Sequence, residues 1–174
     1  MNKIIYNMFP SGLPNIDIEK NIFSGSFSKI IILYPTELCA LTRNQYLCLQ
    51  KFIKNIGEDR YAIFDTFMMQ NGEDHFILQD STSYLDYLEF SANHFLPVTA
   101  IYSLKSTWAI AISDEQYGIA GCIAEYIPQF MKAFQPCQKE REVFANQYAL
   151  RSDLPNKQYN IELVRNILSW TVPM

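Results

Sequence analysis

Two histidines are the side chains best suited to acid–base or metal chemistry in this sequence of 174 residues. His75 follows Glu73 and Asp74 in a predicted turn, and His94 lies near the end of a predicted short helix. Neither belongs to an H-E-x-x-H pattern or to an H-x-E pattern followed by C-x-x-C. We therefore interpret both as ordinary, half-exposed histidines and expect no bound metal.

The four cysteines, Cys39, Cys48, Cys122 and Cys137, form no C-x-x-C pair and no zinc pattern. We expect four free thiols. Cys122 follows Gly121 at a predicted strand-to-helix junction, where a helix N-terminus would lower the pKa of a thiol. This leaves open a cysteine-dependent hydrolase, although a small apolar cysteine facing the core is the favoured interpretation, because free cysteine is among the most buried residue types.

Motifs for nucleotide and cofactor binding are absent from the sequence. Ser24-Gly25-Ser26 lacks the downstream Gly-Lys-Ser/Thr of a phosphate-binding loop, and neither G-x-G-x-x-G nor G-x-S-x-G occurs. Asp86 and Glu89 are three residues apart, a spacing that is typical of a solvated helix face and also leaves a carboxylate-dependent hydrolase open. The net charge of −4 and the pI near 5.2 argue against nucleic-acid binding. We expect no cofactor.

The elements that must position these residues indicate a single domain over residues 1–174, in which residues 1–28 form an N-terminal arm or loop. The hydrophobic content of 49% is enough for a sizeable core. The predicted fold class is α+β: an antiparallel-dominated sheet with a C-terminal β-meander, covered by helices on one face. The predicted strands are 29–34, 61–69, 75–79, 98–104, 108–113 and 117–121. The predicted helices are 42–56, 83–92, 123–134, 139–150 and 161–170.

Local signals support several of these assignments. Thr42 followed by Gln45 predicts a capping box at a helix start, and Gly57 predicts its left-handed end. Pro128 is placed to bend or restart the helix around it. Asn160 is a predicted N-cap for the last helix. Trp108 alternates with isoleucines along its strand, which predicts that it is a core residue.

The amino-terminal residues lack the apolar stretch and cleavage site of a signal peptide, and no apolar run approaches the length of a membrane-spanning helix. We expect a cytoplasmic protein with no membrane partner.

Charge is unevenly distributed along the chain. Residues 58–128 contain eleven Asp and Glu side chains but two Lys and Arg side chains, a net charge of −9. Unpaired carboxylates stay at the surface, so this segment should create a field of one sign that attracts a cationic partner. An ordinary acidic surface that aids solubility is the alternative.

Residues 100–134 combine a strand with an early tryptophan (Trp108), an acidic turn (Asp114-Glu115), a strand ending in glycine (Gly121) and an amphipathic helix. This pattern resembles bacterial immunity proteins, the cytoplasmic antidotes of contact-dependent growth inhibition and related polymorphic toxin systems. The resemblance implies a tight inhibitor of one cognate toxin domain, often a basic nuclease.

Our first hypothesis is therefore an immunity-type protein, not an enzyme, that binds a basic protein toxin and occludes its active site. An unrecognised hydrolase and a self-associating adaptor are the alternatives. A hydrolase should show a cleft on which titratable groups converge, whereas an inhibitor should show a flat or convex acidic patch. The predicted partner-binding residues are Asp114, Glu115, Asp86, Glu89, Tyr84, Tyr87, Glu73 and Asp74.

Overall fold

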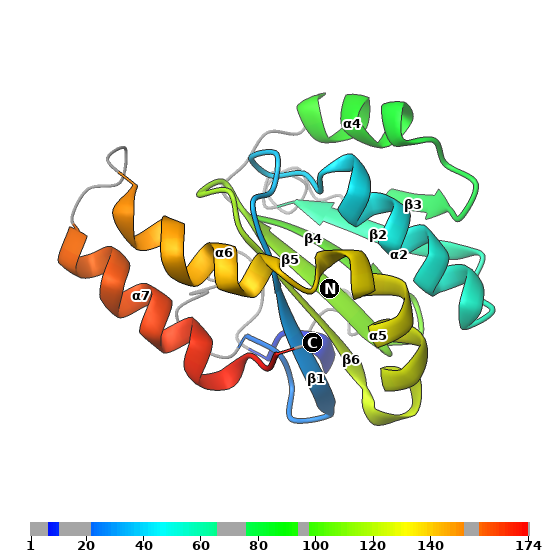
Figure 1. Ribbon diagram of the computed structural model, residues 1–174. Helices are drawn as coiled ribbons and strands as arrows, with labels where there is room; N and C mark the ends of the chain where they lie inside the picture. The colour runs from blue at the N-terminus through cyan, green and yellow to red at the C-terminus, as the bar shows by residue number, and fades with distance from the viewer. Residues whose placement is uncertain (1–6, 11–21, 66–75, 94–97, 152–156, 174) are drawn as a thin grey trace.

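The computed structural model describes residues 7–10, 22–65, 76–93, 98–151 and 157–173. In this part of the chain, six strands form one antiparallel sheet with the order β1-β6-β5-β4-β2-β3 (Figure 1). The strands are β1 (Phe27–Leu33), β2 (Arg60–Asp65), β3 (Phe76–Gln79), β4 (Val98–Ser103), β5 (Trp108–Ser113) and β6 (Gly118–Ile123). The α+β class and the antiparallel sheet predicted from the sequence are confirmed.

Five α-helices and three short 3₁₀ helices accompany the sheet in the described residues. The α-helices are α2 (Arg43–Asn55), α4 (Tyr84–Asn93), α5 (Ile127–Phe134), α6 (Glu140–Gln147) and α7 (Lys157–Trp170). The 3₁₀ helices are η1 (Ala124–Tyr126), η2 (Gln135–Cys137) and η3 (Tyr148–Leu150). Each predicted helix corresponds to one of these elements or to a consecutive group of them.

Helix α2 begins and ends where its sequence predicts. The Thr42 side chain accepts a hydrogen bond from the Gln45 amide, and the Gln45 side chain accepts one from the Thr42 amide, which completes the capping box. Gly57 has a φ of 70°, the left-handed conformation that glycine adopts at little cost. The Glu58 amide then donates to the Ile53 carbonyl, so the orphan carbonyls at the helix end are satisfied.

The predicted meander of β4, β5 and β6 is confirmed by its register. Ile101 lies opposite Ile110, and Ile110 lies opposite Ala120. The two connecting turns are tight because Ser106 and Gln116 adopt left-handed φ values of 59° and 67°. Trp108 is 1% exposed, which confirms that it belongs to the core.

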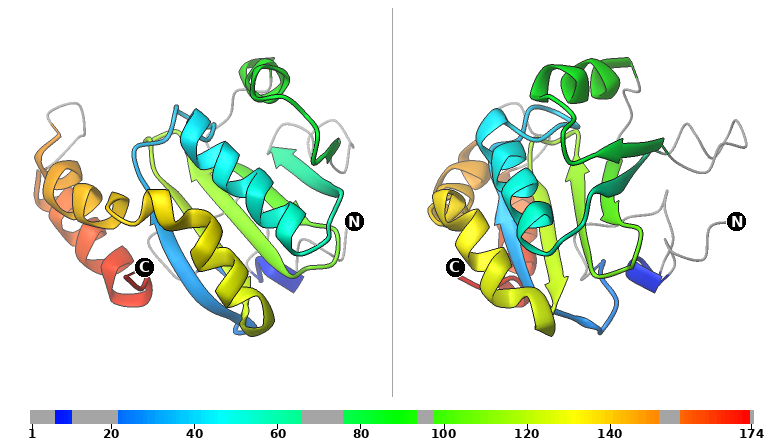
Figure 2. Two further views of the ribbon diagram at one scale, coloured as in Figure 1. Left: turned by 45° about the vertical axis from the view of Figure 1, so that its right-hand side comes forward. Right: turned by 90° about the vertical axis from the view of Figure 1, so that its right-hand side faces the viewer.

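Both faces of the sheet are buried, so covering by helices on one face is too simple a description. Helices α2 and α5 cover one face, where they pack on Trp108, Ile110 and Ile112 (Figure 2). The alternate strand residues, such as Ala109 and Ala111, belong to a second cluster that includes side chains of α6, η3, α7 and residues 22–27. Continuous burial along β4 and β5 follows from this double covering.

The last helix differs from its prediction. Helix α7 begins at Lys157, so Asn160 lies inside the helix, where it is buried, and it is not the N-cap. The chain after α7 returns to the sheet edge, because the Val172 amide donates to the Ile30 carbonyl of β1 at 3.0 Å. The local capping preference of Asn160 thus does not determine where α7 begins.

The strand register divides the connections between two ends of the sheet. At one end, which we call the loop end, β1 leads into residues 34–42, α4 precedes β4, and residues 114–117 join β5 to β6. At the other end, which we call the opposite end, Glu58 and Asp59 precede β2, and residues 104–107 join β4 to β5.

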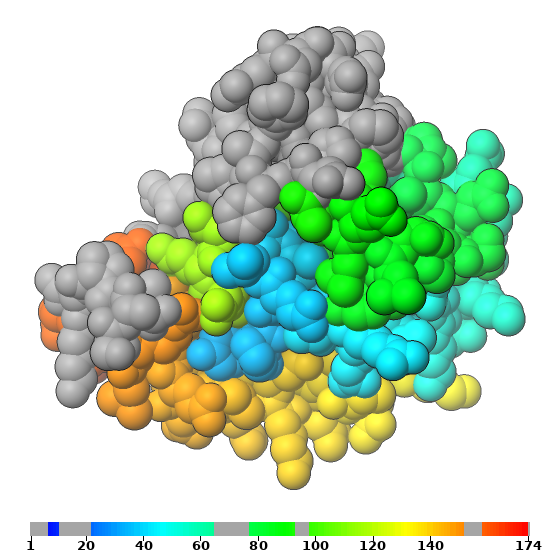
Figure 3. Space-filling model, turned by 90° about the horizontal axis from the view of Figure 1, so that it is seen from above, coloured from blue at the N-terminus to red at the C-terminus, as the bar shows by residue number. Residues whose placement is uncertain are grey.

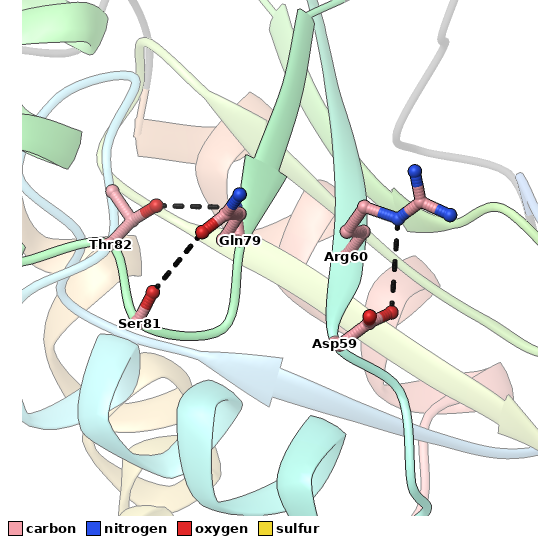
Figure 4. Close-up of polar contacts among 5 residues, drawn as sticks. All are labelled: Asp59, Arg60, Gln79, Ser81 and Thr82. Carbon is pink, nitrogen blue, oxygen red and sulfur yellow. Dashed lines mark hydrogen bonds and ion pairs between the residues drawn. The ribbon is translucent and has the colours of Figure 1, made fainter.

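The opposite end carries ordinary surface polar contacts at the β2–β3 edge (Figure 4). Arg60 and Asp59 form an exposed ion pair at 3.8 Å. The Gln79 amide donates to the Thr82 hydroxyl at 3.2 Å, where the chain turns after β3. An exposed pair of this kind contributes less than about 1 kcal/mol to stability. This part of the opposite end is therefore an ordinary solvated surface.

Candidate functional site

A hollow of about 590 Å³ opens at the loop end. Three segments of the described residues line it: residues 35–40, the α4 residues Leu88, Ser91 and Ala92, and Gln116 from the β5–β6 turn. In Figure 3, which looks down on this end, the loop after β1 lies in blue between α4 in green and the β5–β6 turn in yellow-green. Segments far apart in the sequence thus meet at one surface.

Residues 37–40 form a rigid turn on one side of the hollow. The Glu37 amide donates to the Ala40 carbonyl at 2.8 Å, and the Ala40 amide donates back at 3.0 Å. Leu38, inside this turn, has a φ of 51° and is 44% exposed. A left-handed conformation is uncommon for a residue with a branched side chain and costs about 1 kcal/mol or more. The turn therefore holds an apolar side chain in water at a conformational cost.

The loop is anchored to the rest of the molecule at its start. The Tyr34 amide donates to the Glu140 carboxylate at 2.8 Å, and the Thr36 amide donates to the Gln116 carbonyl at 2.9 Å. Gln45, which is buried at the first turn of α2, donates its amide to the Pro35 carbonyl at 3.0 Å. These bonds fix the loop to α6, to the β5–β6 turn and to α2.

Helix α4 is attached to the same loop through two tyrosines. The Tyr87 hydroxyl accepts from the Leu41 amide at 2.8 Å, and the Tyr84 hydroxyl donates to the Leu41 carbonyl at 3.2 Å. Burial, together with the nearby Glu37 carboxylate, raises the pKa of Tyr84 to about 12, so its hydroxyl stays protonated as a donor. Tyr46 stacks on Tyr87 with ring centroids 4.5 Å apart. Both predicted contact tyrosines thus hold the wall of the hollow in place.

This arrangement corrects one predicted contact. Tyr87 is completely buried, because the side chains that recur along the inner face of α4 are Tyr84, Tyr87, Leu88 and Ser91. It cannot reach a partner. Tyr84 is half-buried, and Leu85 is exposed.

Glu115 also has an internal role in addition to its predicted one. Its carboxylate accepts from the Tyr148 hydroxyl at 2.6 Å, and its carbonyl accepts from Arg151 at 3.1 Å. Arg151 also donates to the Gln116 side chain at 3.2 Å. The β5–β6 turn is therefore tied to η3, and Glu115 helps to hold this turn in place.

The remaining predicted carboxylates in the described residues are exposed. Asp114 lies at the tip of the β5–β6 turn, and Asp86 and Glu89 lie on the outer side of α4. Asp86 is also part of the helix start, because the Ser83 hydroxyl donates to its carboxylate at 2.7 Å. Glu73, Asp74, His75 and His94 lie outside the described residues. Glu37, which the sequence interpretation did not single out, lines the hollow directly.

We call Glu37, Asp86, Glu89 and Asp114 the loop-end carboxylates. Two cations belong to neighbouring elements among the described residues: Arg43, at the first residue of α2, and Arg151, which is held by the β5–β6 turn. Among the described residues, acidic side chains therefore outnumber basic ones around the hollow, and the surface there has a negative field.

The described residues that line the hollow are suited to binding. Glu37 and Cys39 are the titratable side chains among its described lining residues, and apolar surface predominates. Ser91 adds a buried hydroxyl. Within the described ranges, no group of three His, Cys, Asp or Glu side chains is arranged to hold a metal.

Cys122 does not have the environment proposed for a nucleophile. It lies inside β6 and is completely buried, and burial raises the pKa of its thiol to about 12. The predicted helix N-terminus is displaced, because η1 begins at Ala124 and α5 at Ile127. The thiol is therefore less reactive than an ordinary cysteine at neutral pH.

One buried and one partly buried carboxylate were not foreseen from the sequence. Glu58 is 6% exposed and accepts from Ser103, Thr107 and the Trp108 indole, the last at 3.0 Å. Glu140 accepts from the Tyr34 amide and from Gln45. Both lie in segments whose polar sequence is typical of an exposed surface, so their burial is evident only in the folded structure.

No family model matches the sequence, and no match was found among the curated proteins or the solved structures. None of the helices in the described ranges combines the length and the apolar character needed to cross a membrane.

Proposed function

We propose that this chain is an immunity-type binding protein whose loop end captures a basic protein and blocks that protein's active site. The observation that carries this proposal is the combination at one surface of an apolar hollow, an exposed leucine held at positive φ, and the loop-end carboxylates. The pattern-level resemblance of residues 100–134 to bacterial immunity proteins is what suggests a toxin domain as the partner.

The hollow suits recognition of a partner segment that has both apolar and cationic side chains. A volume of about 590 Å³ exceeds that of any single side chain, and the lining is mostly apolar. Leu38 would contact the partner's apolar surface, and Lys or Arg side chains beside it would meet the loop-end carboxylates. Central apolar contacts within a polar rim are the usual anatomy of a protein interface.

The surface differs from the flat or convex patch expected of an inhibitor, because it is concave. It also differs from the cleft expected of a hydrolase, because apolar surface predominates among its described lining residues. The pKa of Cys122 counts further against the hydrolase alternative. Capture of a partner is therefore the function that the geometry supports best.

Footprinting of a complex tests this proposal. The partner would be captured on the immobilised chain from the organism that encodes it, identified and purified. Hydrogen exchange would then be compared with and without partner. We expect protection of residues 35–40, α4 and residues 113–117. Protection confined to residues 104–107 and the outer face of α2, or a partner that is acidic, would contradict the proposal.

A further inference from the structure

Two buried thiols meet between α2 and η2. The Sγ atoms of Cys48 and Cys137 lie 3.8 Å apart, although the residues are 89 positions apart in the sequence. Cys48 is 4% exposed and Cys137 is 1% exposed. All four cysteines are free thiols, as the sequence predicted. The other two, Cys39 in the loop and Cys122 in β6, provide matched internal controls.

The thiol pair adjoins the bonds that anchor the loop of the hollow. Glu140 follows Cys137 by three residues, and Gln45 precedes Cys48 by three residues. The side-chain amide of Gln45 donates to the Glu140 carboxylate at 2.9 Å and to the Pro35 carbonyl at 3.0 Å. The backbone amide of Tyr34 donates to the same carboxylate at 2.8 Å. A change in the spacing of the two sulfurs therefore acts on both partners of this anchor.

The two thiols are not equivalent. The hydrogen bond from Cys137 lowers the pKa of the Cys48 thiol, and Lys51 contributes in the same direction. That same hydrogen bond, burial and the Glu140 carboxylate raise the pKa of Cys137. Cys48 is thus the thiol that ionises first and attacks an oxidant, and Cys137 is the resolving partner.

We propose that Cys48 and Cys137 form a redox-modification site, in which hydrogen peroxide converts the pair to a disulfide inside the folded chain and thereby shifts loop 34–42. The Cys48 thiolate attacks one peroxide oxygen, the O–O bond breaks, and with one proton the products are a sulfenic acid and water. The Cys137 sulfur then displaces the sulfenic hydroxyl, which leaves as a second water with the Cys137 proton. The two sulfurs lose two electrons and the peroxide gains them.

The geometry favours this pair and this oxidant. Bond formation requires the sulfurs to close from 3.8 Å to about 2.05 Å, a movement that one turn of α2 and the short η2 segment can share. Their small exposed surface admits a water-sized oxidant more readily than a bulky disulfide. The movement displaces Gln45 and Glu140 relative to each other and so alters the hydrogen bond that holds the Tyr34 amide.

The test uses the full chain with reduced thiols. It is treated with hydrogen peroxide, the peroxide is removed with catalase, and free thiols are alkylated in denaturant and counted by mass. We expect two of the four thiols to be lost, a cross-linked peptide pair containing Cys48 and Cys137, and full recovery with dithiothreitol. The melting temperature should rise by about 5 °C or more, because the bond closes a long loop.

Variants and a second measurement make the test specific. The double variant Cys39→Ala with Cys122→Ala should still form the bond, whereas Cys48→Ser and Cys137→Ser should not. Peptide mapping of the wild-type chain gives the same answer without any variant. Hydrogen exchange at the Tyr34 amide should change after oxidation, which reports the coupling to the loop without any partner present.

Four remaining thiols after treatment, a sulfinic acid in place of the bond, or a link that involves Cys39 or Cys122 would overturn the proposal. A Cys48–Cys137 bond that leaves Tyr34 exchange unchanged would overturn the coupling to the loop. None of these outcomes depends on the binding function proposed above, so the two can fail separately.

Discussion

Carboxylates serve different purposes at the two ends of the sheet. At the opposite end, Glu58 is buried and accepts hydrogen bonds from Ser103, Thr107 and the Trp108 indole. At the loop end, Asp86, Glu89 and Asp114 are exposed beside an apolar hollow. A buried carboxylate that accepts hydrogen bonds from several buried donors stabilises the fold. An exposed carboxylate contributes little to stability and is available to a partner. Stability and recognition are thus separated along the strands.

The largest expected effect concerns Trp108. Replacing it by alanine removes a large core side chain and leaves Glu58 without its indole donor. We expect the free energy of unfolding to fall by about 3–5 kcal/mol, measured by urea denaturation. Wild-type stability combined with lost partner binding would show that this end, too, is a recognition surface.

Glu58→Gln sharpens the comparison by changing one group in place. The new amide NH₂ would face donors that now bond a carboxylate, so we expect a loss of about 1–3 kcal/mol in the free energy of unfolding. Asp59→Asn is the matched control, since Asp59 is exposed on the neighbouring residue, and it should change stability by less than about 0.5 kcal/mol. Equal effects of the two variants would contradict the structural role of Glu58.

Glu140 is an exception to the comparison, because it is a mostly buried carboxylate near the loop end. Burial raises its pKa from 4.5 to about 7 in the folded chain. Between these values the folded chain keeps a proton that the unfolded chain has lost, so stability falls as the pH rises through this window and levels off above it. Glu140→Gln stays neutral and avoids that loss. We expect its stability relative to wild type to increase by about 1–3 kcal/mol from pH 5 to pH 8, measured by urea denaturation at each pH. A difference that does not vary with pH would contradict this account.

Leu38→Gly separates the fold from recognition at the loop end. Glycine adopts a positive φ without strain, so the variant loses the conformational cost that Leu38 carries. This gain should offset the greater conformational entropy of glycine in the unfolded chain. We therefore expect stability to stay within about 0.5 kcal/mol of wild type. Loss of the exposed side chain should weaken partner binding about tenfold, or about 1.4 kcal/mol, measured by calorimetry. Leu47→Ala, at an exposed leucine of α2, should leave binding unchanged.

The sequence predicted those parts of the fold that depend on local signals. Thr42, Gln45 and Gly57 determine where α2 begins and ends, and alternation of apolar residues locates β5 at its observed bounds. The predicted strands 61–69 and 75–79 correspond to β2 and β3, which pair antiparallel. Asn160 shows the limit of such signals, because it lies inside α7 and not at its start.

The candidate site was only partly predictable, because it depends on contacts between distant segments. Asp86, Glu89 and Asp114 could be identified as surface carboxylates from the charge count. The hollow could not, since residues 35–40 have no distinctive pattern and meet α4 and Gln116 only in the folded chain. The roles of Glu115 and Tyr87 were missed for the same reason: their partners, Tyr148 and Leu41, are 33 and 46 residues away.

The most direct test of the central claim is the association rate with the basic partner as a function of ionic strength. Wild type is compared with Glu89→Lys/Asp114→Lys at the loop end and with Asp59→Lys/Glu125→Lys at the opposite end, which changes the net charge by the same amount. The Debye length, over which salt screens the attraction between charges, shortens from about 10 Å at 0.1 M salt to about 3 Å at 1 M. We predict that the wild-type rate falls steeply with salt, that the loop-end variant associates about tenfold more slowly at low salt, and that the opposite-end variant stays close to wild type. Equal slowing by the two variants, or a wild-type rate that is flat across this range, would contradict recognition through the loop-end carboxylates.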